Sequence, residues 1–589
     1  MQWHPRKARP EHNLDAIGKE LNAADDCDVV VFPETALTGY FVEGGVLEGA
    51  RSCDEVAQGL GTLRPGAPDA IIGFYERHRN QLYNALAYFE AADGRYEVRH
   101  VHRKLFLPTY GLFDEARFVT EGRRVRAFDT RFGRLGLLVC EDLWHSLPAT
   151  ILALDGAELL VVASAAPARD FSAGPGQRGD YDSRGLIAPG NVARWHRLAR
   201  STAEEHGIFV AVAQLVGSEG GKLLAGGSLI VAPDGDTLAE APLFDAAQIS
   251  AELHGRRIAR VRAETPLLGD LETRLETLQS ELDAAIYRAD EGADDSEDEL
   301  RRASLPTGHG GPISPTDGHL LDLDYERVEQ ALVHFICEEV QQRRGFERVV
   351  VGVSGGVDSA VALHLACRAL GPENVFGFRL PYATSSADSL AHADLVLTQT
   401  GAHARTIDIS AAVDGYLATN EPEADGLRRG NVMARTRAIV LFDQAAKLSA
   451  LPLGTGNKSE RLLGYFTWHA DDSPPINPLG DLFKSQVWAL ARHLGVPSEI
   501  VDKPASADLV QGVHDEDELG VAYADADPIL HWLLRGCTPV ELKAAGFSAA
   551  HVDLVHRRLE GTHWKRRLPT VAVLSSTAIG EFYLRPVDY

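Results

Sequence analysis

The chain has 589 residues, of which 45% are hydrophobic and 24% are charged, and its formal net charge is −26. A single hydrophobic core does not grow to this length, so we expect two large domains. Polar residues interrupt every long segment, so no run reaches the roughly 18 apolar residues of a membrane span. The acidic charge disfavours nucleic acid, whose phosphates attract basic surfaces. We therefore expect a globular cytoplasmic protein with small-molecule substrates, no nucleic acid partner and no membrane.

Acidity on this scale is also typical of proteins from a salt-rich cytoplasm, and composition alone does not separate that origin from ordinary solubility. The six cysteines form no C-x-x-C pair, which argues against a disulfide framework and against a zinc cluster. Only ten lysines stand against 48 arginines. Because arginine serves wherever a generic positive charge is enough, a remaining lysine indicates a site that needs a compact ammonium.

The amino-terminal part of the chain consists of short apolar runs bounded by glycine, proline and aspartate. Such runs are typical of buried strands, and a helix is predicted over 191–206 among them. This alternation predicts a layered α/β domain over residues 1–265. The predicted strands are 28–32, 70–74, 136–140, 159–163 and 208–212.

A single amphipathic helix and a linker are predicted between the two domains, over residues 266–320. Leucine or isoleucine recurs at steps of three and four from Leu271 to Ile286, which predicts one helix packed against a domain. The following stretch is rich in glycine, proline and acidic residues, as linkers and exposed loops are. A decorated surface loop within one domain is the alternative.

Residues 321–589 are predicted to form a second α/β domain with a doubly wound parallel sheet. Helical stretches alternate with apolar strands, as in Rossmann-like folds. Ligands of such sheets bind at the carboxyl ends of the strands. The predicted strands are 348–353, 376–380, 405–409 and 450–453.

The first of these strands runs directly into a glycine-rich turn that opens a helix. The turn is Ser354-Gly355-Gly356-Val357-Asp358-Ser359, preceded by Gly352. Main-chain N–H groups and the helix N-terminus converge there and attract an anion, while the aspartate is suited to hold Mg²⁺ against phosphates. The turn lacks the lysine of a Walker loop and is not a G-x-G-x-x-G fingerprint. It resembles the loop of the ATP pyrophosphatase superfamily, which implies cleavage of ATP to AMP and pyrophosphate.

Further motifs in this half resemble those of NAD synthetases, in the same order. They are LGTGNKSE at 453–460, GYFT at 464–467, KPASADL at 503–509, an A-R-x-R helix and a terminal THWKRR. The resemblance implies ATP contacts by Thr455, Lys484 and Ser506, and Mg²⁺ bound by Asp358 and Glu460. It implies contacts with deamido-NAD by the following residues: Asn431, Arg435, Lys458, Asp471 and Lys565.

A candidate thiol nucleophile lies in the amino-terminal half. Glu34, Lys104 and Cys140 each stand at or just beyond an apolar run, so all three are predicted to meet. A cysteine attacks an amide only as thiolate and therefore needs a base, here Glu34, and a positive charge, here Lys104. Glu115 is suited to orient the amide. Taken alone, Cys140 is more typical of a buried core cysteine.

The flanks FPETALTGY, KLFLPTYGLFDEARF and VCEDLW resemble the Glu-Lys-Cys site of the nitrilase superfamily, which implies an α-β-β-α sandwich. Both resemblances together imply a carbon–nitrogen ligase with glutamine as nitrogen donor. It would convert deamido-NAD to NAD through an adenylated intermediate. They also imply a homo-oligomer built on dimers of the synthetase domain.

Two departures weaken the match. The chain begins where the first strand of such a domain should end, so we expect a truncated first strand or a misassigned start. The match is also loose over 163–200, so no glutamine-binding residue is predicted there. Two alternatives stay open: an amidotransferase that adenylates another substrate, and an amidase half that has become a binding module.

Overall fold

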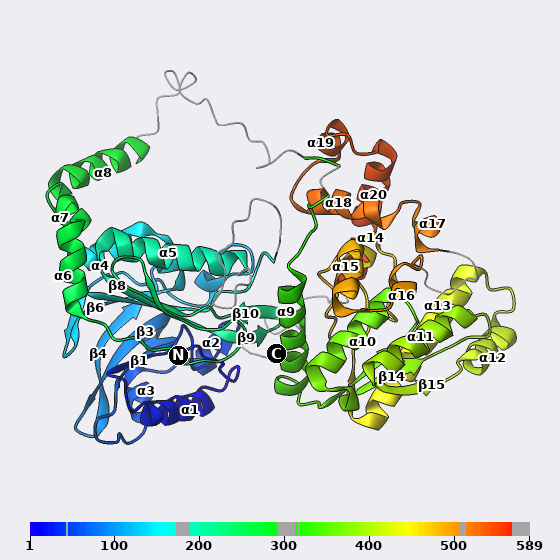
Figure 1. The fold of residues 1–589 in the computed structure, drawn as a ribbon, viewed down its shortest axis with the longest axis horizontal. Coiled ribbons are helices and arrows are strands. Elements are labelled where there is room, and N and C mark those ends of the chain that lie inside the picture. Colours follow the sequence, from blue (N-terminus) through cyan, green and yellow to red (C-terminus); the bar gives the residue numbers. More distant parts are fainter. Residues whose placement is uncertain (43–44, 172–188, 291–312, 316–317, 506–513, 568–589) are drawn as a thin grey trace. The chain divides into compact units, whose positions relative to one another are not determined.

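The computed structural model describes residues 1–42, 45–171, 189–290, 313–315, 318–505 and 514–567. These residues form two compact units. The first contains Met1–Asp170 and the described residues from 189 to 290. The second contains the described residues from 313 to 567 (Figure 1). The domain boundaries predicted from the sequence, 1–265, 266–320 and 321–589, remain predictions.

Two β-sheets form the centre of the first unit. One has four strands in the order β1-β2-β3-β4, and the other has six in the order β12-β11-β8-β7-β6-β5. A separate hairpin consists of β9 and β10. The strand bounds are β1 Val29–Val31, β2 Asp69–His78, β3 Gln81–Ala92, β4 Arg95–Arg103, β5 Phe128–Thr130, β6 Gly133–Val139, β7 Leu159–Ser164, β8 Phe209–Gln214, β9 Val216–Glu219, β10 Lys222–Ala225, β11 Leu229–Val231 and β12 Thr237–Glu240.

The two sheets pack face to face, and helices cover their outer faces. Ile71 and Tyr88 of one sheet share a core with Leu137 and Val161 of the other. Helices α1 (Pro10–Ala23) and α3 (Cys53–Gly59) pack on the first sheet, while α4 (Ser146–Leu154) and α5 (Gly190–His206) pack on the second. Because alternate side chains of each strand face opposite sides, the apolar runs fill both core layers. The predicted α-β-β-α sandwich is confirmed.

The predicted single helix after the first domain is wrong in two respects. The segment from Leu271 to Ile286 spans the end of α7 (Leu267–Glu272) and most of α8 (Leu275–Asp290), with a break at 273–274, and α6 (Gly255–Glu264) precedes it. Only the first part packs: Leu268 of α7 is buried in the core of the first unit, but Leu278, Leu282 and Ile286 of α8 are about half exposed. Helical periodicity therefore predicted the helix but not a partner for its apolar face.

The second unit contains a parallel sheet with strand order β15-β14-β13-β16. Its strands are β13 Arg348–Gly352, β14 Val375–Arg379, β15 His403–Thr406 and β16 Ala450–Pro452. Helices α9 (Tyr325–Cys337), α10 (Val357–Leu370), α11 (Ala387–Thr400) and α15 (Lys484–Leu494) share one core cluster, and α12 (Ser410–Asn420) and α13 (Gly426–Leu448) share another. The predicted Rossmann-like doubly wound sheet is confirmed.

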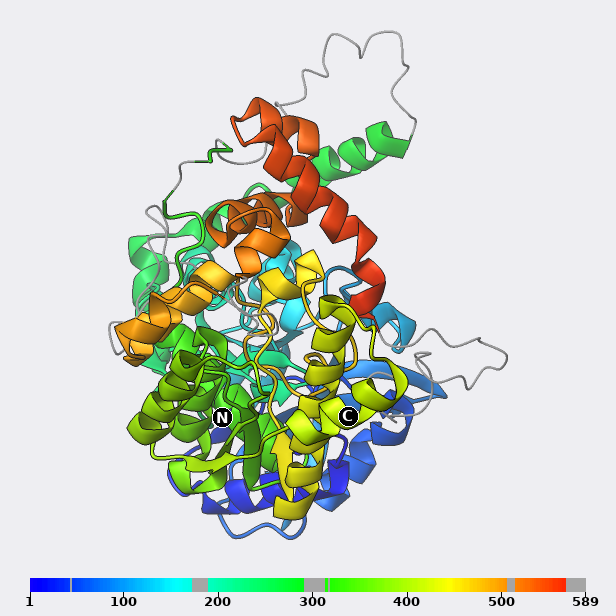
Figure 2. The same cartoon turned by 90° about the vertical axis from the view of Figure 1, so that its right-hand side faces the viewer.

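Strand β15 begins and ends earlier than predicted. The backbone N–H groups of Ile407 and Ile409 still donate to Arg379 and Pro381 of the neighbouring strand, so the chain follows β14 beyond the regular ladder. Of the remaining helices, α16 packs in the first core cluster beside the sheet, and the others share a separate core, where α18, α19 and α20 form a cluster (Figures 1 and 2). The bounds of these remaining helices are α14 Lys458–Leu463, α16 Ser498–Val501, α17 Asp515–Leu519, α18 Tyr523–Leu534, α19 Pro539–Ala544 and α20 Ala549–Gly561.

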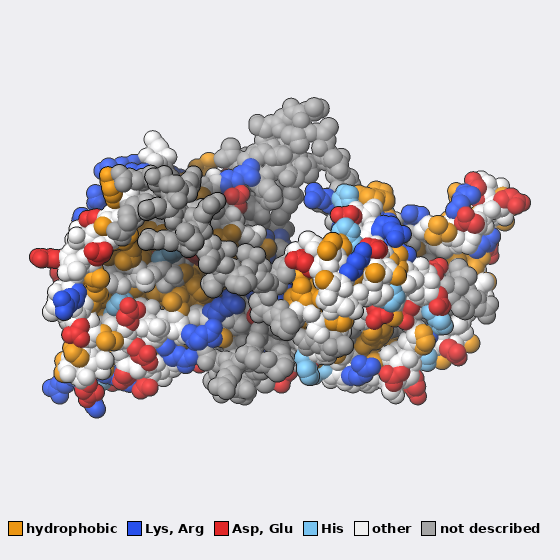
Figure 3. Space-filling view, turned by 90° about the horizontal axis from the view of Figure 1, so that it is seen from above, with side chains coloured by type: hydrophobic (Ala, Val, Ile, Leu, Met, Phe, Trp, Pro, Cys, Tyr) orange, Lys and Arg blue, Asp and Glu red, His pale blue; other side chains and the backbone are white. Residues whose placement is uncertain are grey.

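The described surface mixes charges of both signs. In the face drawn in Figure 3, acidic and basic side chains are interspersed over each unit. Among the described residues, no helix is both long and apolar enough to cross a bilayer. Near the start of the chain, Gln2 and Trp3 form isolated bridges with Ala247 and Leu215.

Candidate active sites

The candidate thiol site of the first unit lies at three strand ends. Glu34 follows β1, Lys104 comes directly after β4, and Cys140 comes directly after β6. Because β1 and β4 belong to one sheet and β6 to the other, the sandwich itself brings these segments together. Glu34, Lys104 and Cys140 were predicted to meet, and the charges of Glu34 and Lys104 do act on the pKa of the Cys140 thiol. Lys104 Nζ lies 2.8 Å from Glu34 Oε1 and 2.6 Å from Glu115 Oε2.

Burial and the neighbouring charges shift the pKa values of Glu34 and Lys104. Glu34 and Lys104 are fully buried. Burial raises the pKa of Glu34 above its ordinary value, although Lys104 and a hydrogen bond from Asn84 oppose the shift. Burial also opposes the ammonium of Lys104, but Glu115 and Glu34 outweigh it and hold the lysine pKa well above its ordinary range. The lysine therefore stays a fixed positive charge between two carboxylates.

Cys140 directly follows β6 and is the first residue of a 3₁₀ helix (Cys140–Trp144), where its backbone is strained. Its φ of +46° lies in the left-handed region, which costs a non-glycine residue on the order of 1–2 kcal/mol. Burial and Glu34 raise the pKa of the thiol, while Lys104 opposes the rise. The thiol must therefore lose its proton to a base as it attacks. Glu34 Oε2 accepts no hydrogen bond within the described part of the chain, so it is available as that base.

The site contains three further side chains that were not predicted from the sequence. Asn84 donates to Glu34 Oε1 at 2.8 Å and to Glu115 Oε1 at 2.5 Å, and Tyr40 OH donates to Glu115 at 3.1 Å. Asn84 is a buried amide within the apolar strand β3, a signal that was visible in the sequence. Ser164 Oγ donates to Cys140 Sγ at 3.4 Å.

Asp142 ties the lysine segment to the cysteine turn. Its carboxylate accepts from the backbone N–H groups of Leu105 at 2.9 Å and Phe106 at 3.1 Å. It also accepts from Val139 N at 3.1 Å and lies 2.8 Å from the ring of His102. The aspartate of the C-E-D-L-W motif thus fixes the segments that carry Lys104 and Cys140 relative to each other.

The predicted phosphate loop of the second unit joins β13 to α10. Ser354 Oγ accepts from Gly356 N at 3.2 Å, and Ser359 Oγ lies 3.3 Å from Ser354 N and 3.2 Å from Ser354 Oγ. Gly355 has φ of +78°, and a Cβ there would stand 2.1 Å from the carbonyl oxygen of Ser389. Only glycine fits this close approach, which keeps the loop compact at the helix N-terminus.

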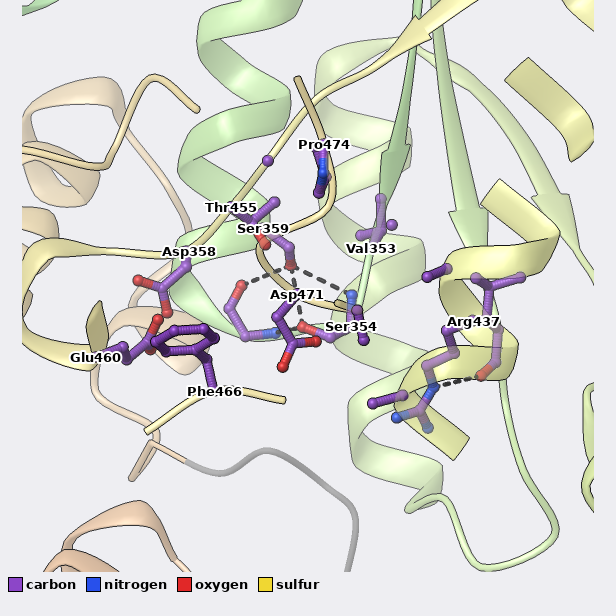
Figure 4. Close-up of a pocket in the computed structure, with 18 of the residues that line it drawn as sticks. Val353, Ser354, Asp358, Ser359, Arg437, Thr455, Glu460, Phe466, Asp471 and Pro474 are labelled. Carbon is purple, nitrogen blue, oxygen red and sulfur yellow. Dashed lines mark hydrogen bonds between the residues drawn. The ribbon is translucent and has the colours of Figure 1, made fainter. Parts of the chain in front are cut away.

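A cavity of about 310 Å³ opens beside this loop at the carboxyl ends of the strands. Figure 4 shows side chains of the loop, of the segment after β16 and of residues 466–474 around it. Of the predicted ATP and metal residues, all that are described line it except Gly355, which supports the loop from behind. These lining residues are Gly352, Ser354, Gly356, Asp358, Ser359, Thr455, Glu460 and Lys484. Ser506 lies outside the described residues.

Two carboxylates and a lysine meet in this cavity. Lys484 Nζ lies 2.5 Å from Asp358 Oδ2 and 3.5 Å from Glu460 Oε1. Asn457 donates to Asp358 Oδ1 at 2.9 Å. Burial and the neighbouring Asp358 raise the pKa of Glu460 to about 8, although Lys484 opposes the shift. A divalent cation between the two carboxylates would relieve this repulsion, so the donor set fits Mg²⁺, which takes one or two carboxylates plus phosphate oxygens.

The residues predicted to face deamido-NAD are not all brought to the cavity. Asp471 lines it, and burial raises the pKa of this carboxyl group. Lys565 Nζ lies behind the wall and donates to the carbonyls of Gly464 at 2.9 Å and Phe466 at 3.1 Å. Lys458 pairs with the exposed Asp481 outside the cavity.

The two predicted substrate residues of α13 also lie beside the cavity and not in its wall. Arg435 donates to the carbonyl of Trp468 at 3.2 Å, and Asn431 Oδ1 accepts from Thr467 Oγ1 at 3.2 Å. Arg437 lines the cavity instead, where its Nε donates to the carbonyl of Leu380 at 3.1 Å. The A-R-x-R motif already indicated that its two arginines do not both face the cavity, because residues two positions apart on a helix point to different sides.

Comparisons with known proteins assign both halves. The carbon–nitrogen hydrolase family matches residues 1–263, and the NAD synthase family matches residues 328–569. The NH(3)-dependent NAD(+) synthetase of Chlorobaculum parvum is 45% identical over 269 residues, which are 46% of this chain and 95% of that protein. That of Fusobacterium nucleatum is 43% identical over 43% of this chain and 97% of its own length.

Two solved structures share the fold over nearly the whole chain. A glutamine-dependent NAD+ synthetase from Acinetobacter baumannii, in complex with ADP, is 21% identical with a TM-score of 0.66, covering 100% of this chain and 98% of that one. One from Cytophaga hutchinsonii is 16% identical with a TM-score of 0.67, covering 96% and 92%. From the sequence matches, the chain belongs to the NAD synthase family and carries a carbon–nitrogen hydrolase domain ahead of its synthase domain.

Proposed function

We propose that this protein is a glutamine-hydrolysing NAD synthetase of the cytoplasm. It amidates deamido-NAD to NAD at the expense of ATP, which leaves as AMP and pyrophosphate, and it draws the ammonia from glutamine. The observation that carries the proposal is the presence, in one chain, of a buried Glu34–Lys104–Glu115 cluster beside Cys140 and of a phosphate loop lined by Asp358, Glu460 and Lys484.

In the first unit, the free oxygen of Glu34 takes the proton of Cys140 as the sulfur attacks the side-chain amide of glutamine. Lys104 is suited to stabilise the negative charge that develops on the carbonyl oxygen. Glu34 then protonates the departing ammonia, and a glutamyl thioester remains. Water activated by the same carboxylate releases glutamate. Glu115 and Asn84 hold Lys104 and Glu34 in place throughout.

In the second unit, the carboxylate of deamido-NAD attacks the α-phosphate of ATP. The loop N–H groups and Ser354 bind the pyrophosphate that leaves, and ammonia then displaces AMP from the adenylated carboxylate. Bound Mg²⁺ would supply charge neutralisation at the phosphates, and Asp358 and Glu460 would hold it. Lys484, fixed between these carboxylates, is available to turn toward the phosphates once a cation replaces it.

The predicted homo-oligomer is proposed to form through the synthetase domains. Helix α13 supports this proposal, because Leu427 and Ile439 project from it with exposures of 76% and 69%. Leu427 and Ile439 lie on one helical face, which also carries Asn431 and Arg435, whereas Phe442 lines the phosphate cavity. An exposed apolar face of this kind is typical of a surface that pairs with another subunit.

NAD formation from deamido-NAD, ATP and Mg²⁺, with glutamine or ammonium as nitrogen source, tests the proposal. The variant Cys140→Ala is expected to lose the glutamine-driven reaction by about 1,000-fold or more and to keep the ammonium-driven one. Cys27→Ala, which changes a half-buried cysteine elsewhere in the same unit, is the matched control and is expected to keep both.

Other outcomes point to other functions. If the wild type forms NAD with ammonium but never with glutamine, the amidase half is a binding module. If neither nitrogen source yields NAD and another carboxylate substrate drives ATP cleavage, the chain is a different adenylating amidotransferase.

A further inference from the structure

Lys503 is a second lysine of the phosphate cavity. It is the first residue of the KPASADL motif, but the proposed reaction has given it no role. It follows α16 and lines the same cavity as Ser354, Asp358 and Thr455. Its Nζ donates to Ser389 Oγ at 3.0 Å. Within the described residues, no carboxylate forms an ion pair with this ammonium, so no acidic side chain of that part of the chain neutralises its charge in the cavity.

The other cavity lysine is in a different electrostatic position. Lys484 lies between the carboxyl groups of Asp358 and Glu460, so its charge is already compensated within the cavity. It therefore offers little net attraction to an anion until a cation occupies the carboxylates. No carboxylate of the described residues compensates Lys503 in this way, so an anionic group in the cavity is attracted to its ammonium in a partly desolvated site.

The position of Lys503 is set by the element that touches the phosphate loop. Ser389, its hydrogen-bond partner, is buried in the first turn of α11 and also accepts from Ser386 Oγ at 2.8 Å. The carbonyl oxygen of the same Ser389 is the atom that a Cβ at Gly355 would strike. The turn that anchors the ammonium thus packs directly against the loop that is shaped for phosphates.

We propose that Lys503 binds the β- and γ-phosphates of ATP and holds the pyrophosphate as it leaves. This inference rests on the proposed ATP cleavage. When the carboxylate oxygen bonds to the α-phosphorus, the bond from that phosphorus to the bridging oxygen breaks and its electron pair stays on pyrophosphate. No proton moves in this step. The charge that accumulates on the leaving group is stabilised by a nearby ammonium, which gains more from product-like pyrophosphate than from bound ATP.

The rarity of lysine in this chain favours this role. With 48 arginines available for generic positive charge, the few lysines are retained where a compact point charge is needed. A lysine that merely covered the surface would be replaceable by arginine, whereas one that meets phosphate oxygens beside a tight glycine loop is constrained in size.

The test compares Lys503→Met, which keeps the length of the side chain but removes its charge, with Lys543→Met as matched control. Lys543 pairs with Asp553 on the helical cluster and does not line the cavity. NAD formation is measured with ammonium and Mg²⁺ while ATP, deamido-NAD and added pyrophosphate are varied. Lys503→Met is expected to raise the KM for ATP and to weaken pyrophosphate inhibition by about tenfold each, as for loss of one charged hydrogen bond.

The KM for deamido-NAD and the Tm of the variant are expected to stay at wild-type values. A variant that loses kcat alone or Tm alone, with ATP and pyrophosphate affinities unchanged, would give Lys503 a merely structural role and overturn the inference. Arginine at this position is expected to recover pyrophosphate affinity only in part.

A second measurement separates this inference from the proposed function. Pyrophosphate with Mg²⁺ is expected to raise the Tm of the full-length wild type and to raise that of Lys503→Met much less. If the wild type makes no NAD but shows this difference, the proposed substrate fails and the anion site stands. If both proteins are stabilised equally, the anion site at Lys503 is wrong whatever the reaction.

Discussion

At the scale of single residues, the first unit concentrates buried charge where its strands end. Glu34, Lys104 and Glu115 are all buried, and each carboxylate faces the one ammonium. Burial of such groups is costly unless every charge is paired and hydrogen bonded. Asn84 supplies two of those hydrogen bonds, so this neutral side chain influences how readily Glu34 takes a proton.

We predict that Asn84→Leu moves the acid limb of the glutaminase pH profile upward. Glu34 must be ionised to act as base, its pKa is raised by burial, and the Asn84 hydrogen bond partly opposes that rise. Loss of this donor raises the pKa further, by about one unit for a charge-assisted hydrogen bond. The pH dependence of kcat/KM for glutamine hydrolysis measures the shift, and ammonium-driven NAD formation is the control. An unmoved acid limb would show that another group governs it.

At the scale of secondary structure, helix α15 is capped from outside its own sequence. Its preceding residue Phe483 has no polar side chain to bind the first N–H groups. Lys484 N instead donates to Ser459 Oγ at 2.9 Å, and Ser485 N donates to Asp527 of α18 at 2.9 Å. Ser459 and Ser485 also donate their hydroxyls to the same carboxylate. Asp527 thereby joins the helices that present Glu460 and Lys484 to the phosphate cavity.

We predict that Asp527→Ala destabilises the synthetase unit by about 2–4 kcal/mol, because several buried donors lose their acceptor at once. Chemical denaturation measures this cost. The matched control is Asp553→Ala, which removes a half-exposed ion pair with Lys543 and is expected to cost little. A cost for Asp527→Ala no larger than that of the control would contradict the capping role.

The pH dependence of that cost is a separate prediction. Burial raises the pKa of Asp527 from 3.8 to about 6. A raised folded-state pKa contributes stability that is complete below the unfolded value and is lost as pH rises through the folded value. The difference in unfolding free energy between wild type and Asp527→Ala is therefore expected to shrink between about pH 4 and pH 6. A difference that grows with pH over this window would show that the carboxylate is stabilised in its charged form.

At the scale of the whole molecule, two candidate sites reside in separate compact units of one chain. Each site lies at the ends of β-strands. Cys140 follows a strand of the two-sheet sandwich, whereas the phosphate loop follows a strand of a parallel sheet. The proposed oligomer would also place a second subunit near the substrate site, because the exposed apolar face of α13 carries Asn431 and Arg435, which are predicted to contact deamido-NAD.

We predict that Ile439→Glu dissociates the protein into smaller species, since it places a charge on an exposed apolar face that a neighbouring subunit would cover. Sedimentation equilibrium of wild type and variant measures the change. Leu278→Glu, at a half-exposed apolar position on α8 of the first unit, is the matched control. A monomeric wild type at working concentration would contradict the proposed oligomer, and an unchanged variant would exclude this face.

Local sequence predicted the strands, most helices, and the chemistry of the cysteine segment and of the phosphate loop. The spacing of apolar residues, the glycines of turns and the charged residues at strand ends are all visible in neighbouring residues. Cys140, Lys104 and Glu34 were identified in this way, as was the run from Ser354 to Ser359. The parallel sheet of the second unit was expected from the alternation of strands and helices, and it agrees with the structure, whereas the order of the strands was not predicted.

Tertiary structure alone decided which residues share a site and which only support it. Asn84, Tyr40 and Asp527 reach their partners from segments far along the chain, and no local pattern records such contacts. Packing also placed Lys458 on the surface, where it pairs with Asp481, and left the apolar face of α8 exposed. Helical periodicity predicts which residues share a face of a helix, but not which element covers that face. Long-range contacts depend on how the elements stack, and that stacking is a property of the folded chain.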